Sequence, residues 1–248
     1  MYKFGERHPV LFELVLVVAA FLAAALVSVV VNEVCYDPEL SGSAARIVTG
    51  AALLVLYHRA MRGGKPLANL RVAAPALLFA AWNLFYNLSS GMVPGDAACL
   101  TRAVVTALAP ALFEEALFRV VFLYNLKQSG AGDRKCLLVS AAVFAAIHLT
   151  NIVGADGAGV ALQTAYSLVV GLVFGAVYLK NESVLQIVFA HFLTDFTNRI
   201  YVERASSATA AHLILFGLLL AAETVYAVWL PGASKSSPAQ YNSRRGSG

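Results

Sequence analysis

The chain has 248 residues, of which 59% are hydrophobic and 13% are charged, and its mean hydropathy is +0.72. Because soluble proteins average about 45–50% apolar and about 25% charged residues, this composition excludes a soluble domain and indicates an integral membrane protein. The 18 basic and 14 acidic residues give a net charge of +4, which in a membrane protein is an orientation signal and offers no support for a nucleic-acid partner.

Short clusters of charge separate apolar runs that are each about the 20 residues a helix needs to cross a bilayer. The runs do not alternate in polarity over about 10 residues, so the strands of a membrane barrel are excluded. The sequence therefore predicts an all-α, polytopic membrane helix bundle of about eight transmembrane helices. In chain order the predicted spans are 10–31, 44–57, 72–88, 101–126, 136–153, 160–179, 183–200 and 210–230.

The polar content of the spans divides the chain into parts. Residues 1–100 form an N-terminal three-helix membrane part, residues 101–200 a helical core with unusual polar residues, and residues 201–233 a C-terminal transmembrane helix. Residues 234–248 are rich in Ser, Pro and Arg without apolar periodicity and are predicted to form a disordered tail. Asn83 and Asn87 are predicted to hydrogen-bond between helices, and Gly171 and Gly175 to allow close packing of a scaffold helix.

Basic residues predict the orientation of the spans. One side of the membrane receives 13 Lys and Arg residues, including Arg134, whereas the other receives four: Arg46, Arg102, Arg199 and Arg204. Cytoplasmic loops carry the excess of Lys and Arg. The sequence therefore predicts a multi-pass protein of the cell membrane with both termini in the cytoplasm, and an even number of spans requires the same.

Ionisable residues inside spans cost about 2.5–3.5 kcal/mol each on insertion scales, so each needs a partner or a task. Six stand out: Glu114, Glu115 and Arg119 in span 101–126, His148 in span 136–153, and His191 and Asp195 in span 183–200. Spacings of i and i+4 place Glu115 with Arg119, Phe144 with His148, and His191 with Asp195 on shared helix faces.

Helix rise predicts that these residues lie at one depth, in the outer half of the membrane. Such pairs can also serve only to lock helices together, and that purely structural interpretation is the first alternative. Burying six polar groups at one level without a function would be a costly way to hold a bundle, so a functional cluster is favoured.

Three motifs carry a family resemblance: Glu114-Glu115-x-x-x-Arg119, Phe144-x-x-x-His148 and His191-x-x-x-Asp195. In this order, on separate hydrophobic spans, they resemble the motifs of the CPBP family, the CaaX-processing and bacteriocin-processing intramembrane endopeptidases. The resemblance covers about residues 101–200. It implies an intramembrane protease, of the glutamic type, and the chain lacks the motifs of the zinc, serine and aspartate intramembrane proteases.

Peptide hydrolysis needs an activated water, an oxyanion stabiliser and a proton donor for the leaving amine. Glu114 is the expected general base, and His148 would share the water or pass the proton. The resemblance implies that His191 and Asp195 polarise the scissile carbonyl. Where the family motif has an asparagine form, this chain has Asp195, which must either stay protonated to donate or act by orienting His191.

Three further residues are expected to support the catalytic residues: Glu115, Arg119 and Phe144. We expect Arg119 to pair with Glu115 one turn away. A zinc ion bound by Glu114, His148 and His191 is an alternative, but the His residues lack a local i, i+4 spacing and no separate base would remain. A mechanism without metal or other cofactor is therefore favoured.

The expected partners are the lipid bilayer and a membrane-anchored or lipidated protein or peptide substrate. Because the cluster is predicted in the outer half of the bundle, the favoured substrate is a protein with a C-terminal sorting-signal anchor, met from the extracytoplasmic side. Two alternatives stay within the family: a CaaX prenyl-protein endopeptidase acting from the cytoplasmic side, and a non-catalytic immunity or scaffold protein. A proton-coupled carrier is a further alternative.

Overall fold

A computed structural model describes residues 8–57, 69–153, 156–202 and 209–232. The predicted tail at 234–248 and several basic residues used for the orientation lie outside these ranges: Lys3, Arg7, Arg59, Arg62, Lys65, Arg204, Lys235, Arg244 and Arg245. Within the described ranges the chain is helical, and one isolated bridge joins Pro94 to Tyr201. The predicted all-α membrane bundle is confirmed.

Eight helical rods follow one another in the described residues, and each predicted span falls on one of them. They are α2 (Pro9–Cys35); α3 (Pro38–Leu56); α4 (Leu70–Ala73), η2 (Ala74–Leu77) and α5 (Leu78–Ser89) in line; α6 (Ala97–Glu115), η3 (Ala116–Phe122) and α7 (Leu123–Gln128) in line; α8 (Asp133–Ile147) followed by η4 (His148–Val153); α9 (Gly157–Asn181); α10 (Val184–Arg199); and α11 (Ala210–Gly232).

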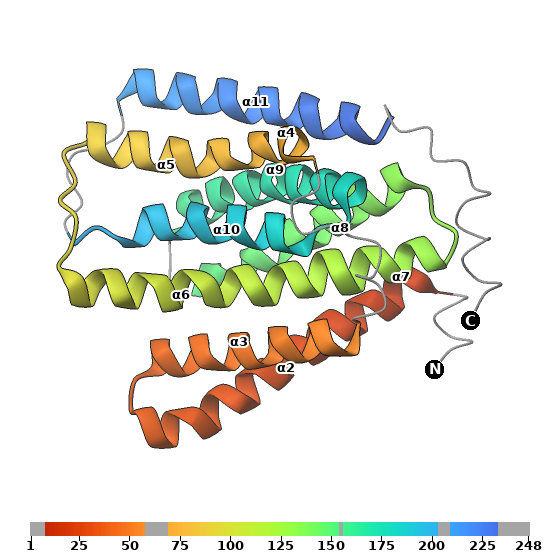
Figure 1. Cartoon of the computed structure of the whole chain (residues 1–248), viewed down its shortest axis with the longest axis horizontal. Helices are drawn as coiled ribbons and strands as arrows, with labels where there is room; N and C mark the ends of the chain where they lie inside the picture. The colour runs from red at the N-terminus through yellow and green to blue at the C-terminus, as the bar shows by residue number, and fades with distance from the viewer. Residues whose placement is uncertain (1–7, 58–68, 154–155, 203–208, 233–248) are drawn as a thin grey trace.

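The rods run side by side in layers (Figure 1). The α2–α3 hairpin packs on α6, α10 lies between α6 and α5, and α9 contacts both α8 and α11. Six rods of the described part are long and apolar enough to cross a membrane, and α6 and α10 are not among them. These two rods carry most of the predicted polar cluster; they pack on each other, with α3 on α6 and α5 on α10.

Glycines set the close approach of α9 to α8, as predicted. A Cβ atom at Gly171 would lie 3.1 Å from Ala141 Cα and 3.3 Å from Phe144 Cδ1, and one at Gly175 would lie 2.7 Å from Leu137 Cδ1. These distances are shorter than ordinary contacts between carbon atoms, which have their optimum at about 3.5–4.0 Å. The small residues therefore let α9 press against the helix that ends at His148.

Two asparagine side chains tie α5 to α10. Asn83 Nδ2 donates to the Thr194 carbonyl oxygen at 2.9 Å, and Asn87 Nδ2 donates to the Thr197 carbonyl oxygen at 2.9 Å. The prediction that Asn83 and Asn87 hydrogen-bond between helices is confirmed. Since both bonds are buried in a bundle without competing water, they fix α5 along the helix that holds His191.

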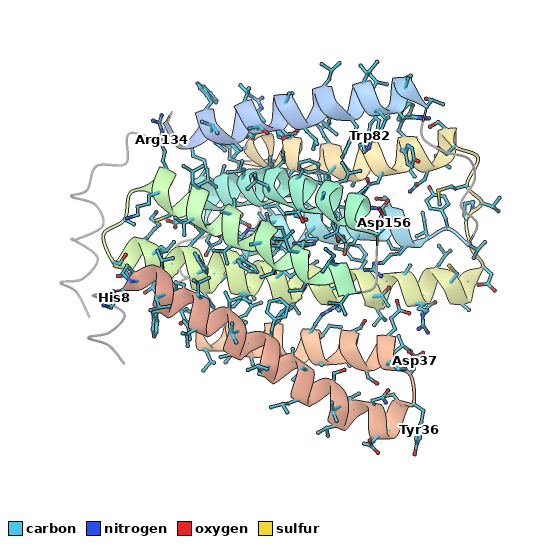
Figure 2. All side chains as sticks on the ribbon, turned by 180° about the vertical axis from the view of Figure 1, so that it is seen from behind. His8, Tyr36, Asp37, Trp82, Arg134 and Asp156 are labelled. Atoms are coloured by element: carbon cyan, nitrogen blue, oxygen red, sulfur yellow. The ribbon has the colours of Figure 1, made fainter. Side chains whose placement is uncertain are left out.

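The bundle has two ends that differ in charge. His8 and Arg134 lie at one end, called here the Arg134 end, and Tyr36, Asp37 and Asp156 lie at the other, called the Asp37 end (Figure 2). At the Asp37 end, Arg102 Nη1 lies 2.9 Å from Asp37 Oδ2. Hydrogen bonding to this guanidinium lowers the pKa of Asp37 to about 2, so the pair remains charged at all but strongly acidic pH.

The close packing of α9 on α8 gives a first testable prediction. Gly171→Val should lower the free energy of unfolding by about 1–3 kcal/mol, because the new side chain is forced against the Ala141 backbone and Phe144. Gly217→Val in α11 is the matched control, since a Cβ there meets nothing within 4 Å. Thermal unfolding in detergent measures both, and equal melting temperatures for the two variants would contradict the packing.

Candidate active site

Glu115 is the centre of the buried polar cluster. Its side chain is fully buried, with Oε2 3.0 Å from Arg119 Nε, and Oε1 2.8 Å from His191 Nδ1. The predicted pairing of Glu115 with Arg119 is confirmed. The bond to His191 was not predicted, and it joins α6 to α10. Because a carboxylate can only accept, His191 donates this bond and carries a proton on Nδ1.

The chain leaves Glu115 in an unusual helical form. Residues Ala116–Phe122 (η3) form a π-helix in which every residue is buried. Backbone hydrogen bonds in a π-helix join residues that are five apart in the sequence. Such turns occur frequently at functional sites. This segment places Arg119 in the core, against the ring of Phe144.

Arg119 is held by an aromatic ring as well as by charge. Its Cζ atom lies 4.6 Å from the centroid of the Phe144 ring. Nη1 and Nη2 have no hydrogen-bond partner among the described residues, so the face of the ring supplies the second attraction for the cation. Phe144 thus supports Arg119, and its ring also lies 5.0 Å from that of His148.

Glu114 points away from Glu115, because successive residues on a helix are about 100° apart. Its side chain is 15% exposed, and Oε2 lies 3.9 Å from His191 Nε2. Asp195 Oδ1 approaches the same Nε2 atom at 3.9 Å. His191 therefore has one nitrogen bonded to a buried carboxylate and the other turned toward two carboxylates that water can reach.

His148 ends α8 at the junction with η4, and its Nδ1 lies 2.8 Å from the carbonyl oxygen of Phe144. Since a carbonyl oxygen only accepts, Nδ1 is protonated and Nε2 of the neutral ring keeps its lone pair. An imidazole in this state can accept a proton or a hydrogen bond from water. The neighbouring electrostatic partners of Glu114 include both His148 and Arg46 of α3.

A cavity of about 490 Å³ is lined by four predicted site residues: Phe144, His148, His191 and Asp195. Glu114 is not part of this lining and approaches the site through His191 Nε2. The cavity continues between α5, α9 and α11, and residues that the sequence did not single out line it: Trp82, Leu162, Gln163, Tyr166, Ser167, Val170, Thr194, Asn198 and Phe216. The span predicted as a scaffold helix, 160–179, therefore also supplies part of the cavity wall. Sequence reasoning missed Gln163 and Tyr166 because neither has a charged partner at helical spacing in this apolar span.

Asp195 has a basic neighbour that sequence reasoning had assigned to an outer segment. Arg199 Nη2 lies 3.9 Å from Asp195 Oδ2, and Arg199 Nη1 lies 3.8 Å from Glu39 Oε1. Glu115 accepts the hydrogen bond from His191 Nδ1 and so is the residue that orients the imidazole. Asp195 instead lies on the cavity side of the imidazole, between His191 and Arg199.

The zinc alternative involved Glu114, His148 and His191. No group of three or more His, Cys, Asp or Glu side chains in the described ranges is arranged to hold a metal ion. The bond from His191 Nδ1 to a carboxylate is also one that zinc-binding histidines make.

Carboxylates and imidazoles gathered beside a cavity, inside a bundle of membrane-crossing helices, are features of a membrane-embedded enzyme. Residues 96–197 match the family model described as "Type II CAAX prenyl endopeptidase Rce1-like". The match confirms the CPBP-family resemblance drawn from the three motifs and supports a membrane protease of this general type. Comparison with curated proteins and with solved structures gives no match.

The Glu115–Arg119 pair gives a second prediction. Arg119→Ala should lower the free energy of unfolding by about 3–5 kcal/mol, because it leaves the carboxylate of Glu115 buried without its cation. Arg134→Ala is the control, since Arg134 is exposed at the far end of the bundle. Folded yield and thermal unfolding in detergent report the difference. Wild-type stability of the Arg119 variant would show that the pair does not hold the core.

Proposed function

We propose that the protein is an intramembrane endopeptidase that hydrolyses a peptide bond of a membrane-tethered protein with water activated by Glu114. The observation that carries this proposal is the arrangement around His191, in which Glu115 bonds Nδ1 of the imidazole and Glu114 faces Nε2. An oriented imidazole that lines the cavity, with a partly exposed carboxylate 3.9 Å from its Nε2, can serve acid and base steps at the edge of that cavity.

In the proposed reaction Glu114 takes a proton from water while the water oxygen attacks the carbonyl carbon of the scissile bond. His148, whose Nε2 lone pair is directed by the bond at Nδ1, holds the same water. When the carbon–nitrogen bond breaks, the proton passes from Glu114 to the leaving amine. His191 and Asp195 lie on the cavity side where the scissile carbonyl group would be placed, and the proposed reaction uses no metal.

The position of the cavity bears on the substrate. Its lining includes Gly159, near the start of α9, and Asn198, near the end of α10, and both helix termini belong to the Asp37 end. Basic residues gather at the opposite end, which the positive-inside rule assigns to the cytoplasm. We therefore infer cytoplasmic termini and a C-terminally anchored substrate that enters from the extracytoplasmic side.

The description of the matched family favours a second candidate, a CaaX prenyl endopeptidase. Its substrate carries the lipidated cysteine near a cytosolic C-terminus, so the cavity would have to be reached from the Arg134 end. A non-catalytic immunity or scaffold protein is the third candidate, but each ionisable residue of the three motifs is present.

Glutamate substitution tests the proposed chemistry. Glu114→Gln should reduce kcat by about 10²–10⁴-fold, because the amide cannot accept the proton of water. Glu13→Gln is the control, since Glu13 is another glutamate inside the bundle, at 1% exposure, but lies in α2 and does not line the cavity. Cleavage of a farnesylated CaaX peptide and of a reporter with a C-terminal membrane anchor is measured in proteoliposomes.

Full activity of a folded Glu114→Gln variant would remove Glu114 as the base. The same preparations can be analysed for bound metal. One zinc ion per wild-type chain, lost in the Glu114→Gln variant, would favour the metal alternative.

Cysteine labelling tests the side of entry. With the other native cysteines replaced, Cys35, Asn151→Cys and Asn198→Cys should react with an impermeant thiol reagent added to intact cells, whereas Arg134→Cys should not. The first three positions are exposed near the Asp37 end, and Arg134 is exposed at the other. The reverse pattern would make the cytosolic CaaX substrate the better assignment.

A further inference from the structure

Tyr166 places a phenol in the wall of the cavity that His191 and Asp195 also line. Its ring is held between two others, with centroids 5.6 Å from Phe79 and 5.8 Å from Phe216. The hydroxyl oxygen is buried, and it has no hydrogen-bond partner among the described residues. Two aromatic contacts thus fix a polar group whose hydrogen bond is not made within this part of the chain.

A buried hydroxyl without a partner needs an explanation. Buried tyrosines usually find an acceptor, and leaving such a group unpaired costs about 1–3 kcal/mol. Asn83 lies beside the phenol, but its Nδ2 already donates to the Thr194 carbonyl at 2.9 Å. A bond from this amide nitrogen would end on the phenol oxygen, and the proton of Tyr166 has no acceptor among the described residues.

The proposed hydrolysis requires a hydrogen-bond donor for the oxygen that becomes an oxyanion. The asparagine form of the motif would offer an amide N–H at position 195, whereas an Asp195 carboxylate facing Arg199 can only accept. His191 uses Nδ1 to bond Glu115. Asp195 is near enough to Tyr166 for the two to interact electrostatically, so the phenol lies in the neighbourhood where the amide is missing.

We propose that Tyr166 is a catalytic residue whose hydroxyl donates a hydrogen bond to the carbonyl oxygen of the scissile peptide as that oxygen becomes an oxyanion. The inference rests on the proposed endopeptidase function. As water adds to the carbonyl carbon and gives its proton to Glu114, the carbonyl π electrons move to this oxygen. Tyr166 keeps its own proton throughout, and the bond it donates strengthens as the charge develops.

A double-substitution cycle with Asp195 tests this role. Tyr166→Phe keeps the ring between Phe79 and Phe216 and removes only the hydroxyl, so kcat should fall by about 10²-fold while KM stays within about twofold. In the Asp195→Asn background, where an amide donor returns, the same Tyr166→Phe change should cost less than about fivefold. Tyr178→Phe, which removes a phenol from the core of the same helix outside the cavity lining, is the matched control and should leave kcat unchanged.

Each result is decisive when kcat is measured for the substrate that wild-type protein cleaves and Glu114→Gln does not. A loss at Tyr166 that shrinks in the Asp195→Asn background supports the assignment. Unchanged kcat in Tyr166→Phe overturns it, and so does an equal loss in both backgrounds, which would mark a structural effect. Failure of wild-type protein to cleave either reporter would overturn the proposed function, and this inference with it.

Discussion

The carboxylate of Glu115 is the constraint on which the rest of the site depends. A charge this deep is tolerated only when it is paired, and Glu115 is paired twice, with Arg119 on its own rod and with His191 on α10. Both partners must therefore lie in the interior. This requirement brings α6 and α10 together, and the more apolar α3 and α5 pack on them.

Two adjacent glutamates differ in their surroundings because they leave the helix in different directions. Glu115 is fully buried and accepts the bond from His191 Nδ1, whereas Glu114 is partly exposed and faces Nε2 of the same imidazole. The π-helical segment that follows them carries Arg119 to the ring of Phe144. The first two motifs therefore meet through a cation and an aromatic face, which accounts for a phenylalanine one turn before His148.

The motifs were readable from the sequence because an ionisable residue in an apolar run is conspicuous and its helical spacing fixes its face. The all-helical bundle, the Glu115–Arg119 pair and the asparagine contacts of α5 followed from the same reasoning. The partner of His191 did not, because spacing gives no rotation of one helix relative to another, and Glu115 rather than Asp195 holds Nδ1. Tyr166 and Trp82 were missed because aromatic residues are ordinary in membrane helices and only the fold turns them toward the cavity.

The ion pairs at the Asp37 end form a continuous chain with alternating sign. Asp37 and Glu39 bind Arg102, Glu39 also faces Arg199, and Arg199 faces Asp195 at the cavity. All these side chains are partly exposed, so dissolved ions screen their attractions over about 8–10 Å at ordinary ionic strength. Because salt weakens exposed pairs of this kind, the ionic strength of the medium at that face acts on Arg199, the ion-pair partner of a residue in the cavity wall.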